Sequence, residues 1–442
     1  MDFEQIKKTT DISNNPEALK STTEISSNLE CQKTLEKSVK KSTDFEVDFG
    51  NSSDQIFAKK HLQRAEHLAN QNNLEKSIVA CSQSLQYDPK LVMAYKLLGD
   101  NLAKIGKISE GITAYFQALA IASDDDNVYF KLSNLTVNKQ EQNQIIAEYQ
   151  KLVATQPESA EAYFYYAKTL AANQQWQSAI KYYQQVIDIN SDFGEVYYYF
   201  GEALVQLEQW QSAADKLTVA VAVDCESSWA YHYLGIAQFQ MEQWESAKIA
   251  FQQAIKLNAD FSWSYFHLAE TLTNQNLLES ATKVYQRFLE LESNFAYGYQ
   301  RLGDVLSQQL AMNSQPESEN LKAALQAYQC SMELEPDELL TYYKALQLNP
   351  KDKFWCHQLA KAYVRADKLV NAIIFYRLLL ELGSDNATTH FELAQVLEKR
   401  NNILPAIKHY EIALHLEPAK AEYIDALKQL ETKLDTSNPD GD

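Results

Sequence analysis

The chain has 442 residues, of which 45% are hydrophobic, and this is ample for a core and excludes wholesale disorder. Its 11 glycines and 9 prolines lie far below the usual share of about 12 per cent, so turns that need a positive or fixed φ are few and β-sandwiches and barrels are disfavoured. The formal net charge of -19 disfavours nucleic acid and anionic membrane surfaces as partners, because both are bound by clustered Lys and Arg.

Residues 1–56 differ in composition from the rest of the chain. Serine and threonine make 14 of these 56 residues, and aromatic residues are limited to Phe3, Phe45 and Phe49. A segment of this kind buries too little apolar surface to offset the entropy of folding. We therefore predict a disordered, Ser/Thr-rich N-terminal tail at 1–56.

Export, membrane insertion and disulfide formation are not indicated by the sequence. The first residues, MDFEQIKKTT, lack the apolar segment of a signal peptide. The longest apolar runs, such as Leu217–Val223, are too short to span a bilayer. The five cysteines are widely spaced and form no Cys-x-x-Cys pair, which argues against a disulfide framework and a zinc site. We therefore predict a cytoplasmic protein without membrane insertion.

The dominant pattern is a repeat of 34 residues. Seven tyrosines, which we call the column tyrosines, follow that interval without a miss: Tyr95, Tyr129, Tyr163, Tyr197, Tyr231, Tyr265 and Tyr299. Four residues after each of them stands a small residue: Gly99, Ser133, Ala167, Gly201, Gly235, Ala269 and Gly303. Each unit carries two segments with apolar residues three and four apart, as in amphipathic helices. One pair of such helices cannot bury its apolar faces alone, so the pattern predicts an all-α stack of helix pairs.

The units resemble those of the tetratricopeptide repeat (TPR) family, in the form of a bacterial multi-repeat array. The family pattern is W-x2-L-G-x2-Y, then A-x3-F, then P, and Tyr231–Phe251 carries Y-x2-L-G followed by A-x3-F. The proline position is kept in part: Pro89, Pro157, Pro336, Pro350 and Pro418. The resemblance implies a right-handed superhelical solenoid of antiparallel helix pairs with a C-terminal capping helix.

The register divides the chain into successive segments. We expect a TPR array at 57–312, then an irregular segment at 313–352, two further units within 353–420, a capping helix at 421–434 and a disordered tail at 435–442. The individual units are expected at 58–91, 92–125, 126–159, 160–193, 194–227, 228–261, 262–295, 296–338, 353–386 and 387–420.

The irregular segment 313–352 combines two departures from the pattern. The unit 296–338 is 43 residues long, nine more than the repeat, and contains a polar loop at Met312–Asn320. Leu339–Asp352 then supplies a single helix, which breaks the alternation of first and second helices. The segment is either a kink in the superhelix or an eroded repeat with its own packing, and the sequence favours neither.

The resemblance implies a ligand groove, because known TPR ligands usually lie on a concave surface lined by the first helix of each pair. Its inward positions are those one, two and five residues after the column tyrosine and two before it. Within 160–305 these positions are rich in aromatic and acidic residues, which provide contact area and favour basic or neutral ligands. We therefore predict a groove formed by Tyr165, Tyr198, Tyr199, Trp229, His232, Tyr233, Trp263, Phe266, His267, Glu202, Glu270 and Arg301.

Two alternatives concern residues of this groove. Phe266, like Phe164 and Phe130 at the equivalent positions, has an equal claim to packing between neighbouring repeats. His232 and His267 could be drawn, with an acidic neighbour, as a metal or acid–base site, but no third ligand is apparent. No phosphate loop, dinucleotide fingerprint, nucleophile elbow or H-E-x-x-H motif occurs in the sequence. We therefore predict no catalytic residue, no metal and no cofactor.

These features lead to two functional hypotheses. The first is a non-catalytic scaffold that binds an extended peptide or a helix of another protein in the groove. The second, which the resemblance to bacterial arrays implies, is an accessory or substrate-recognition module for a glycosyl-, sulfo- or methyltransferase, with contact to a glycan. The Lys/Asn/Arg clamp by which some TPR domains hold a chaperone tail is not matched, because Tyr165 stands where a cation is needed.

Overall fold

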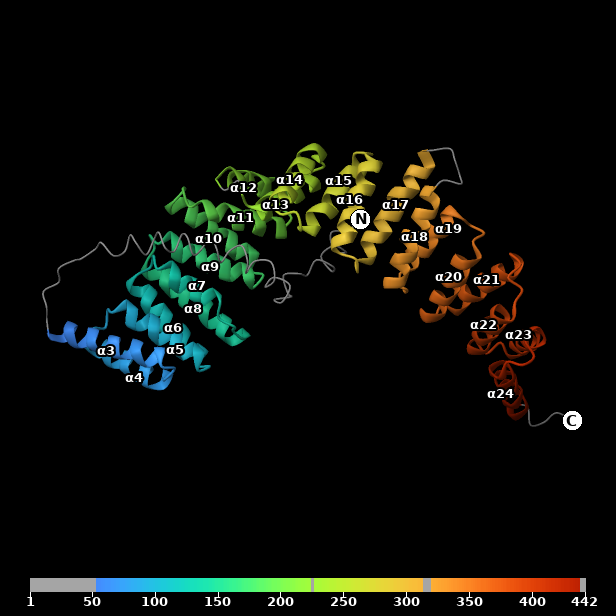
Figure 1. The fold of residues 1–442 in the computed structure, drawn as a ribbon, viewed down its shortest axis with the longest axis horizontal. Coiled ribbons are helices and arrows are strands. Elements are labelled where there is room, and N and C mark those ends of the chain that lie inside the picture. Colours follow the sequence, from blue (N-terminus) through green and yellow to red (C-terminus); the bar gives the residue numbers. More distant parts are fainter. Residues whose placement is uncertain (1–52, 224–225, 313–318, 438–442) are drawn as a thin grey trace. The chain divides into compact units, whose positions relative to one another are not determined.

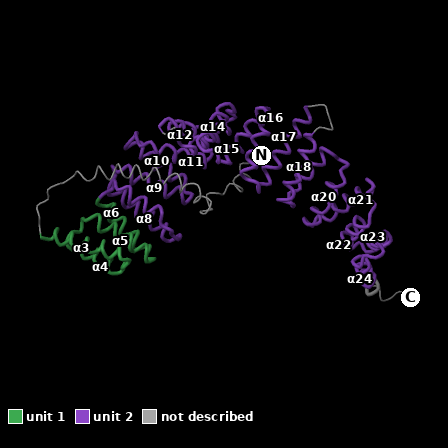
Figure 2. Tube along the Cα trace, viewed as in Figure 1, with its two compact units in different colours: residues 1–121 green, residues 122–442 purple. Residues whose placement is uncertain are grey.

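The computed structural model describes residues 53–223, 226–312 and 319–437. These residues form 22 helices, α3 to α24, and no strand (Figure 1). The contacts within the chain define two compact units, residues 1–121 and 122–442 (Figure 2). Of the tail expected at 1–56, only the last four residues are described, and they begin helix α3. Of the loop expected at Met312–Asn320, residues 313–318 lie outside the described part.

The described part of the first unit, from residue 53, contains four helices: α3 (Ser53–Asn70), α4 (Leu74–Tyr87), α5 (Val92–Lys104) and α6 (Ile108–Ile121). Buried polar side chains tie the first three together. Ser77 Oγ donates to Ala65 O at 2.6 Å, and Asn101 Nδ2 donates to Ser77 Oγ at 2.9 Å. Cys81 is fully buried beside them, and burial raises the pKa of its thiol to about 12, so it packs as a small apolar residue.

The second unit contains the remaining helices; from α8 onward each packs on the next along the chain, and α7 contacts α9. The helices are α7 (Asp126–Ser133), α8 (Lys139–Thr155), α9 (Ala160–Ala172), α10 (Trp176–Ile189), α11 (Gly194–Gln206), α12 (Trp210–Val223), α13 (Ser228–Gln240), α14 (Trp244–Leu257), α15 (Ser262–Asn274), α16 (Leu278–Leu291), α17 (Ala296–Met312), α18 (Glu319–Leu334), α19 (Leu339–Leu348), α20 (Lys353–Arg365), α21 (Leu369–Glu381), α22 (Ala387–Lys399), α23 (Ile403–Leu416) and α24 (Ala421–Ser437).

Close approach of the two helices of a pair explains the small residue after each column tyrosine. A Cβ atom added at Gly235 on α13 would lie 2.6 Å from the ring of Phe251 on α14, and one at Gly201 would lie 2.4 Å from Leu217. The large side chain of the second helix thus occupies the space over the backbone of the first. This contact fixes the rotation of each first helix, and therefore decides which of its residues face outward.

The turn inside each pair also follows the repeat. Gln174, Glu208, Glu242 and Asn276 lie 34 residues apart, and each has a left-handed backbone with φ between 58° and 60°. The amides that follow bond back to the end of the first helix, as Gln243 N does to Gln238 O at 2.9 Å. This is the C-terminal capping geometry that glycine adopts most easily. The chain places glycine there at Gly106, where φ is 82°.

We expect Glu242→Gly to raise the free energy of unfolding by about 1 kcal/mol, because a non-glycine residue in the left-handed region costs roughly 1–2 kcal/mol. The reciprocal change, Gly106→Ala, is expected to lower it by a similar amount, since an added Cβ there meets no atom within 4 Å and only the backbone cost remains. Urea unfolding followed by circular dichroism measures both changes. Shifts of the same sign in the two variants would contradict this account of the turn.

Candidate functional site

Side-chain contacts between successive first helices of the second unit define one surface, which we call the inner face. On it, the residue five positions after one column tyrosine contacts the residue two positions after the next, 31 residues along the chain. Tyr233 Oη donates to Glu202 Oε1 at 3.0 Å. Arg301 donates to Glu270 through Nε at 2.7 Å and Nη2 at 2.9 Å. The repeat thus builds a ladder of contacts between neighbouring first helices.

The enlarged unit keeps this ladder in register. Lys344 Nζ donates to Asp304 Oδ2 at 2.7 Å across 40 residues, which is the usual 31 plus the nine extra residues of that unit. Lys344 lies two residues after Tyr342, whose hydroxyl donates to the carbonyl six residues before it at 2.7 Å. The column tyrosine Tyr197 makes the same contact at 3.1 Å. Helix α19 therefore has the register of a first helix.

A series of aromatic contacts crosses α9, α11 and α13. Ring centroids lie 5.5 Å apart for Phe164 and Tyr199, and 4.8 Å apart for Tyr199 and Tyr198. The series continues from Tyr198 to Tyr233 at 6.2 Å and from Tyr233 to Trp229 at 6.0 Å. Trp229 is 37% exposed, and the tyrosines are half-buried. We call the partly exposed members of this region the aromatic patch: Tyr165, Tyr198, Tyr199, Trp229 and Tyr233.

Lys168 is the cation of this region. Its Nζ lies 4.1 Å from the ring centre of Tyr199 and 5.0 Å from that of Phe164, within the range of cation–π attraction. The same Nζ lies 3.7 Å from Glu195 Oε1. Burial raises the pKa of Tyr199, and the charge of Lys168 opposes that rise. A cation is thus held on the aromatic patch by rings and a carboxylate together.

Three residues expected in the groove lie in the interior. Phe266, His232 and His267 are buried, with 1%, 5% and 8% exposure. His232 and Phe266 follow the column tyrosine directly, and this position turns toward the next repeat. Trp263 is half-buried, with its ring 5.3 Å from that of Phe295. At the equivalent positions Phe164 is buried and Phe130 is 55% exposed, so these phenylalanines do not share one environment.

The two buried histidines are neutral packing residues. His232 Nδ1 lies 2.9 Å from Ser264 Oγ, and the ring of His267 stacks on Phe251 at 5.6 Å. Burial lowers the pKa of His232 well below its usual value and that of His267 to about 4. Their rings lie 5.6 Å apart. Within the described residues no group of three or more His, Cys, Asp or Glu side chains is arranged to hold a metal ion.

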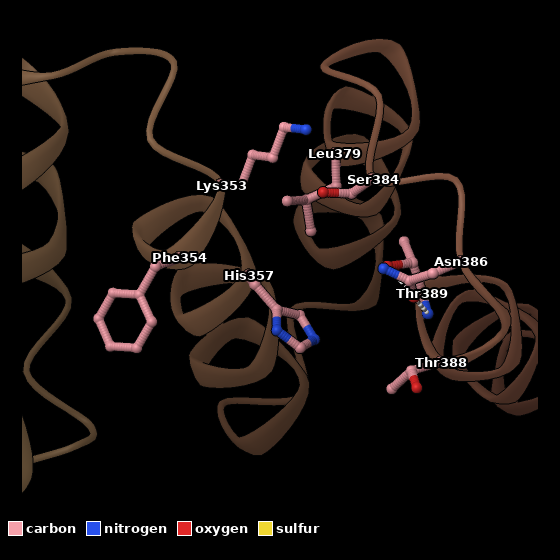
Figure 3. A pocket seen from close by; sticks show the side chains of 8 residues that line it. All are labelled: Lys353, Phe354, His357, Leu379, Ser384, Asn386, Thr388 and Thr389. Atoms are coloured by element: carbon pink, nitrogen blue, oxygen red, sulfur yellow. Dashed lines mark hydrogen bonds between the residues drawn. The ribbon is translucent and has the colours of Figure 1, made fainter.

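A second polar cluster, near the C-terminus, escaped sequence reasoning. Glu392 on α22 accepts bonds from His357 Nε2 and, at 3.0 Å, from Lys361 Nζ on α20. Lys361 and Glu392 are 31 residues apart, so the ladder spacing would have paired them. Beside them lies a pocket of about 300 Å³, with the ring of His357 on one side and residues of α22 on the other (Figure 3). It is lined by Lys353, Phe354, His357, Leu379, Ser384, Asn386, Thr388 and Thr389.

We expect His267→Phe to reduce the loss of stability on acidification. The pKa of His267 is about 4 in the folded chain and about 6.5 when unfolded, so between these values the unfolded state binds a proton that the native state does not. The free energy of unfolding therefore falls by about 3 kcal/mol as pH drops through this window. Phenylalanine keeps the aromatic packing and removes this loss. Urea titrations at pH 7 and pH 5 test it, and equal losses in both proteins would refute it.

Comparison with known families places parts of the chain among helical repeats. The family model of the anaphase-promoting complex, cyclosome, subunit 3 matches residues 138–220, and a tetratricopeptide repeat model matches residues 229–260. No curated protein matches the sequence.

Several solved structures are similar to parts of the chain. YrrB, a TPR protein with an unusual peptide-binding site, is 22% identical over 44% of this chain and 96% of its own, with a TM-score of 0.39. MamA from Desulfovibrio magneticus RS-1 is 20% identical over 38% and 96%, with a TM-score of 0.35. The Pseudomonas aeruginosa protein pilF is 18% identical over 55% and 98%, with a TM-score of 0.40.

The segment 229–260, which the tetratricopeptide model matches, forms most of the pair α13 and α14. Pairs with the same 34-residue register, the same small residue and the same left-handed turn recur along the chain. The chain is therefore a tetratricopeptide repeat protein.

Proposed function

We propose that the chain is a non-catalytic scaffold that binds an extended peptide or a helix of another protein on its inner face. The observation that carries the proposal is the aromatic patch, because its tyrosines are only half-buried and Trp229 is exposed, so these residues remain partly accessible to solvent. TPR proteins as a family bind proteins or peptides. None of the described helices has the length and apolar character needed to cross a bilayer, and we retain the cytoplasm as the predicted location.

The packing of the aromatic patch suits it to binding. Tyr198 contacts both Tyr199 and Tyr233, and Tyr233 contacts Trp229, so the rings are held before a partner arrives. Fixed rings lose little conformational entropy on binding, and this raises affinity for a given contact area. Tyrosine and tryptophan at such positions are the residues whose truncation costs most in interfaces.

A second candidate is an accessory module for a glycosyl-, sulfo- or methyltransferase that contacts a glycan. The exposed ring of Trp229 and the neighbouring tyrosines favour it, because aromatic faces stack on sugars. The two candidates differ in electrostatics. A basic peptide is attracted by Glu195 and Glu202, whereas a neutral glycan is held by stacking and hydrogen bonds, which salt affects little.

We expect the double substitution Tyr199→Ala, Tyr233→Ala to leave the helix content unchanged and to release the protein partner. Truncation of interface hot spots costs about 2 kcal/mol or more, roughly a 30-fold loss of affinity each. Capture from native lysate with mass spectrometry compares the wild type with this variant. Tyr182→Ala, on the second helix α10, is the matched control and should retain the partner. If the double variant unfolds, the tyrosines are core residues. If it keeps the partner, the inner face is not the site.

We expect binding of a captured protein partner to weaken at least tenfold between 0.1 M and 0.5 M salt. At the higher salt concentration charges act over only a few ångströms, and this reduces the attraction between the acidic inner face and a basic ligand. Affinity measured at both salt concentrations tests this. A ligand that is held equally well at both would favour the glycan candidate over the peptide.

A further inference from the structure

Acids of the inner-face ladder are paired with cations, and Glu202 on α11 differs from them. Glu270 is paired with Arg301, and Asp304 is paired with Lys344. Glu202 occupies the same position, five residues after a column tyrosine, but the residue opposite it is Tyr233 rather than a cation. Within the described residues the structure records no ion pair for Glu202. The ladder thus repeats its acid at Glu202 without repeating the cation.

The carboxylate of Glu202 is partly satisfied and partly buried. Tyr233 Oη bonds its Oε1 at 3.0 Å, whereas the structure records no bond to its Oε2 from any described residue. Its side chain is neither fully buried nor fully exposed. Burial raises the pKa of Glu202, opposed by the Tyr233 hydroxyl and by the charge of Lys168. A half-buried carboxylate gains more from a nearby cation than an exposed one, because water screens the attraction less.

Aromatic rings stand around this carboxylate. The ring centroid of Tyr198 lies 6.2 Å from that of Tyr233, and the ring centroid of Trp229, a residue that is 37% exposed, lies 6.0 Å from it. Rings of this kind attract cations through their faces. The negative charge of Glu202 also contributes to the raised pKa of Tyr198, after burial. A cation bound beside Glu202 would therefore be attracted by the carboxylate and by these rings together.

The preceding contact of the ladder shows that this surface holds a cation. Lys168 places its Nζ 4.1 Å from the ring centre of Tyr199 and 3.7 Å from Glu195 Oε1. There the chain supplies ring, carboxylate and cation. At Glu202 the described residues supply rings and a carboxylate but no ion pair.

The repeat before that of Glu202 departs from the usual contact between a tyrosine of the second helix and an acid of the first. In other repeats the tyrosine of the second helix donates to the acid of the first, as Tyr115 does to Asp100 at 2.7 Å and Tyr328 does to Asp304 at 2.9 Å. At the equivalent position of the α9–α10 pair stands Lys168 rather than an acid, and among the described residues the hydroxyl of the fully buried Tyr183 has no hydrogen-bond partner. The charge of Glu202 adds to the effect of burial in raising the pKa of Tyr183.

We propose that Glu202 receives an arginine or lysine side chain of the partner peptide, with Tyr198, Tyr233 and Trp229 as its aromatic wall. This inference rests on the proposed peptide-binding function and specifies the chemistry of the ligand. Arginine is favoured, because a planar guanidinium bonds a carboxylate and stacks on rings at once. The pair Arg301–Glu270, two repeats further on, shows a guanidinium that bonds a carboxylate of this ladder through two nitrogens.

The test selects peptides from a random displayed nine-residue library on the full chain. The wild type, Glu202→Gln and the variant Tyr199→Ala, Tyr233→Ala are compared, with Glu279→Gln as control. Glu279 is an exposed acid on α16, so this control makes the same charge change away from the inner face. Glutamine at position 202 keeps an acceptor for the Tyr233 hydroxyl, and circular dichroism checks its fold.

We expect peptides enriched by the wild type to share a basic residue at one position. Replacing that residue by neutral citrulline or norleucine should weaken binding to the wild type and to Glu279→Gln at least tenfold. It should weaken binding to Glu202→Gln by less than threefold, because the interaction is already lost there. The citrulline comparison on the wild type needs no variant, so it stays informative if Glu202→Gln misfolds.

The failures of the two proposals are distinguishable. The role of Glu202 would be overturned if the enriched peptides shared no basic residue. It would also be overturned if replacing the basic residue weakened binding to Glu202→Gln as much as binding to the wild type. If such peptides still require Tyr199 and Tyr233, peptide binding on the inner face stands. If no peptide is enriched by the wild type over the tyrosine variant, both proposals fall.

Discussion

The close approach of the two helices within each pair is the constraint on which the rest of the structure depends. At Gly235 the ring of Phe251 fills the space that a Cβ would take, so the first helix has one allowed rotation against the second. With that rotation fixed, residues at set distances from the column tyrosine face the same way in successive repeats. The ladder of contacts at a spacing of 31 residues, including Glu270 with Arg301, is a consequence of this packing rather than a separate design.

The enlarged unit shows how strictly the register is kept. Its nine extra residues shift Asp304 and Lys344 to a separation of 40, yet the two side chains meet as their counterparts do elsewhere. An insertion between α17 and α18 therefore adds length without changing the surface that the first helices present. Helix α19 continues that surface. The next helix, α20, also has the register of a first helix, because its Lys361 pairs with Glu392 on α22 at the ladder spacing. Two helices of first-helix type thus follow one another.

The helix pairs could be predicted from the sequence, because small, aromatic and tyrosine positions repeat in phase. The burial of individual groove residues could not. Phe164 and Phe130 occupy equivalent positions, yet one is buried and the other is 55% exposed, since exposure depends on how the neighbouring repeat covers the position. The pairing of Glu202 with Tyr233 was also not predicted. It joins two different positions in successive repeats, so it is found only by comparing residues that lie 31 apart.

The distribution of charge over the inner face matters more for recognition than the net charge of -19. Glu270 and Asp304 on the ladder are neutralised by Arg301 and Lys344 of the chain itself. Arg301 is 16% and Glu270 14% exposed, and two hydrogen bonds join them. Such pairs stiffen the contact between repeats and offer little to a ligand. Selectivity for a charged partner must therefore arise where the internal pairing is incomplete. At Glu202 the ladder places a tyrosine opposite the acid, and among the described residues the carboxylate has a hydrogen bond but no ion pair.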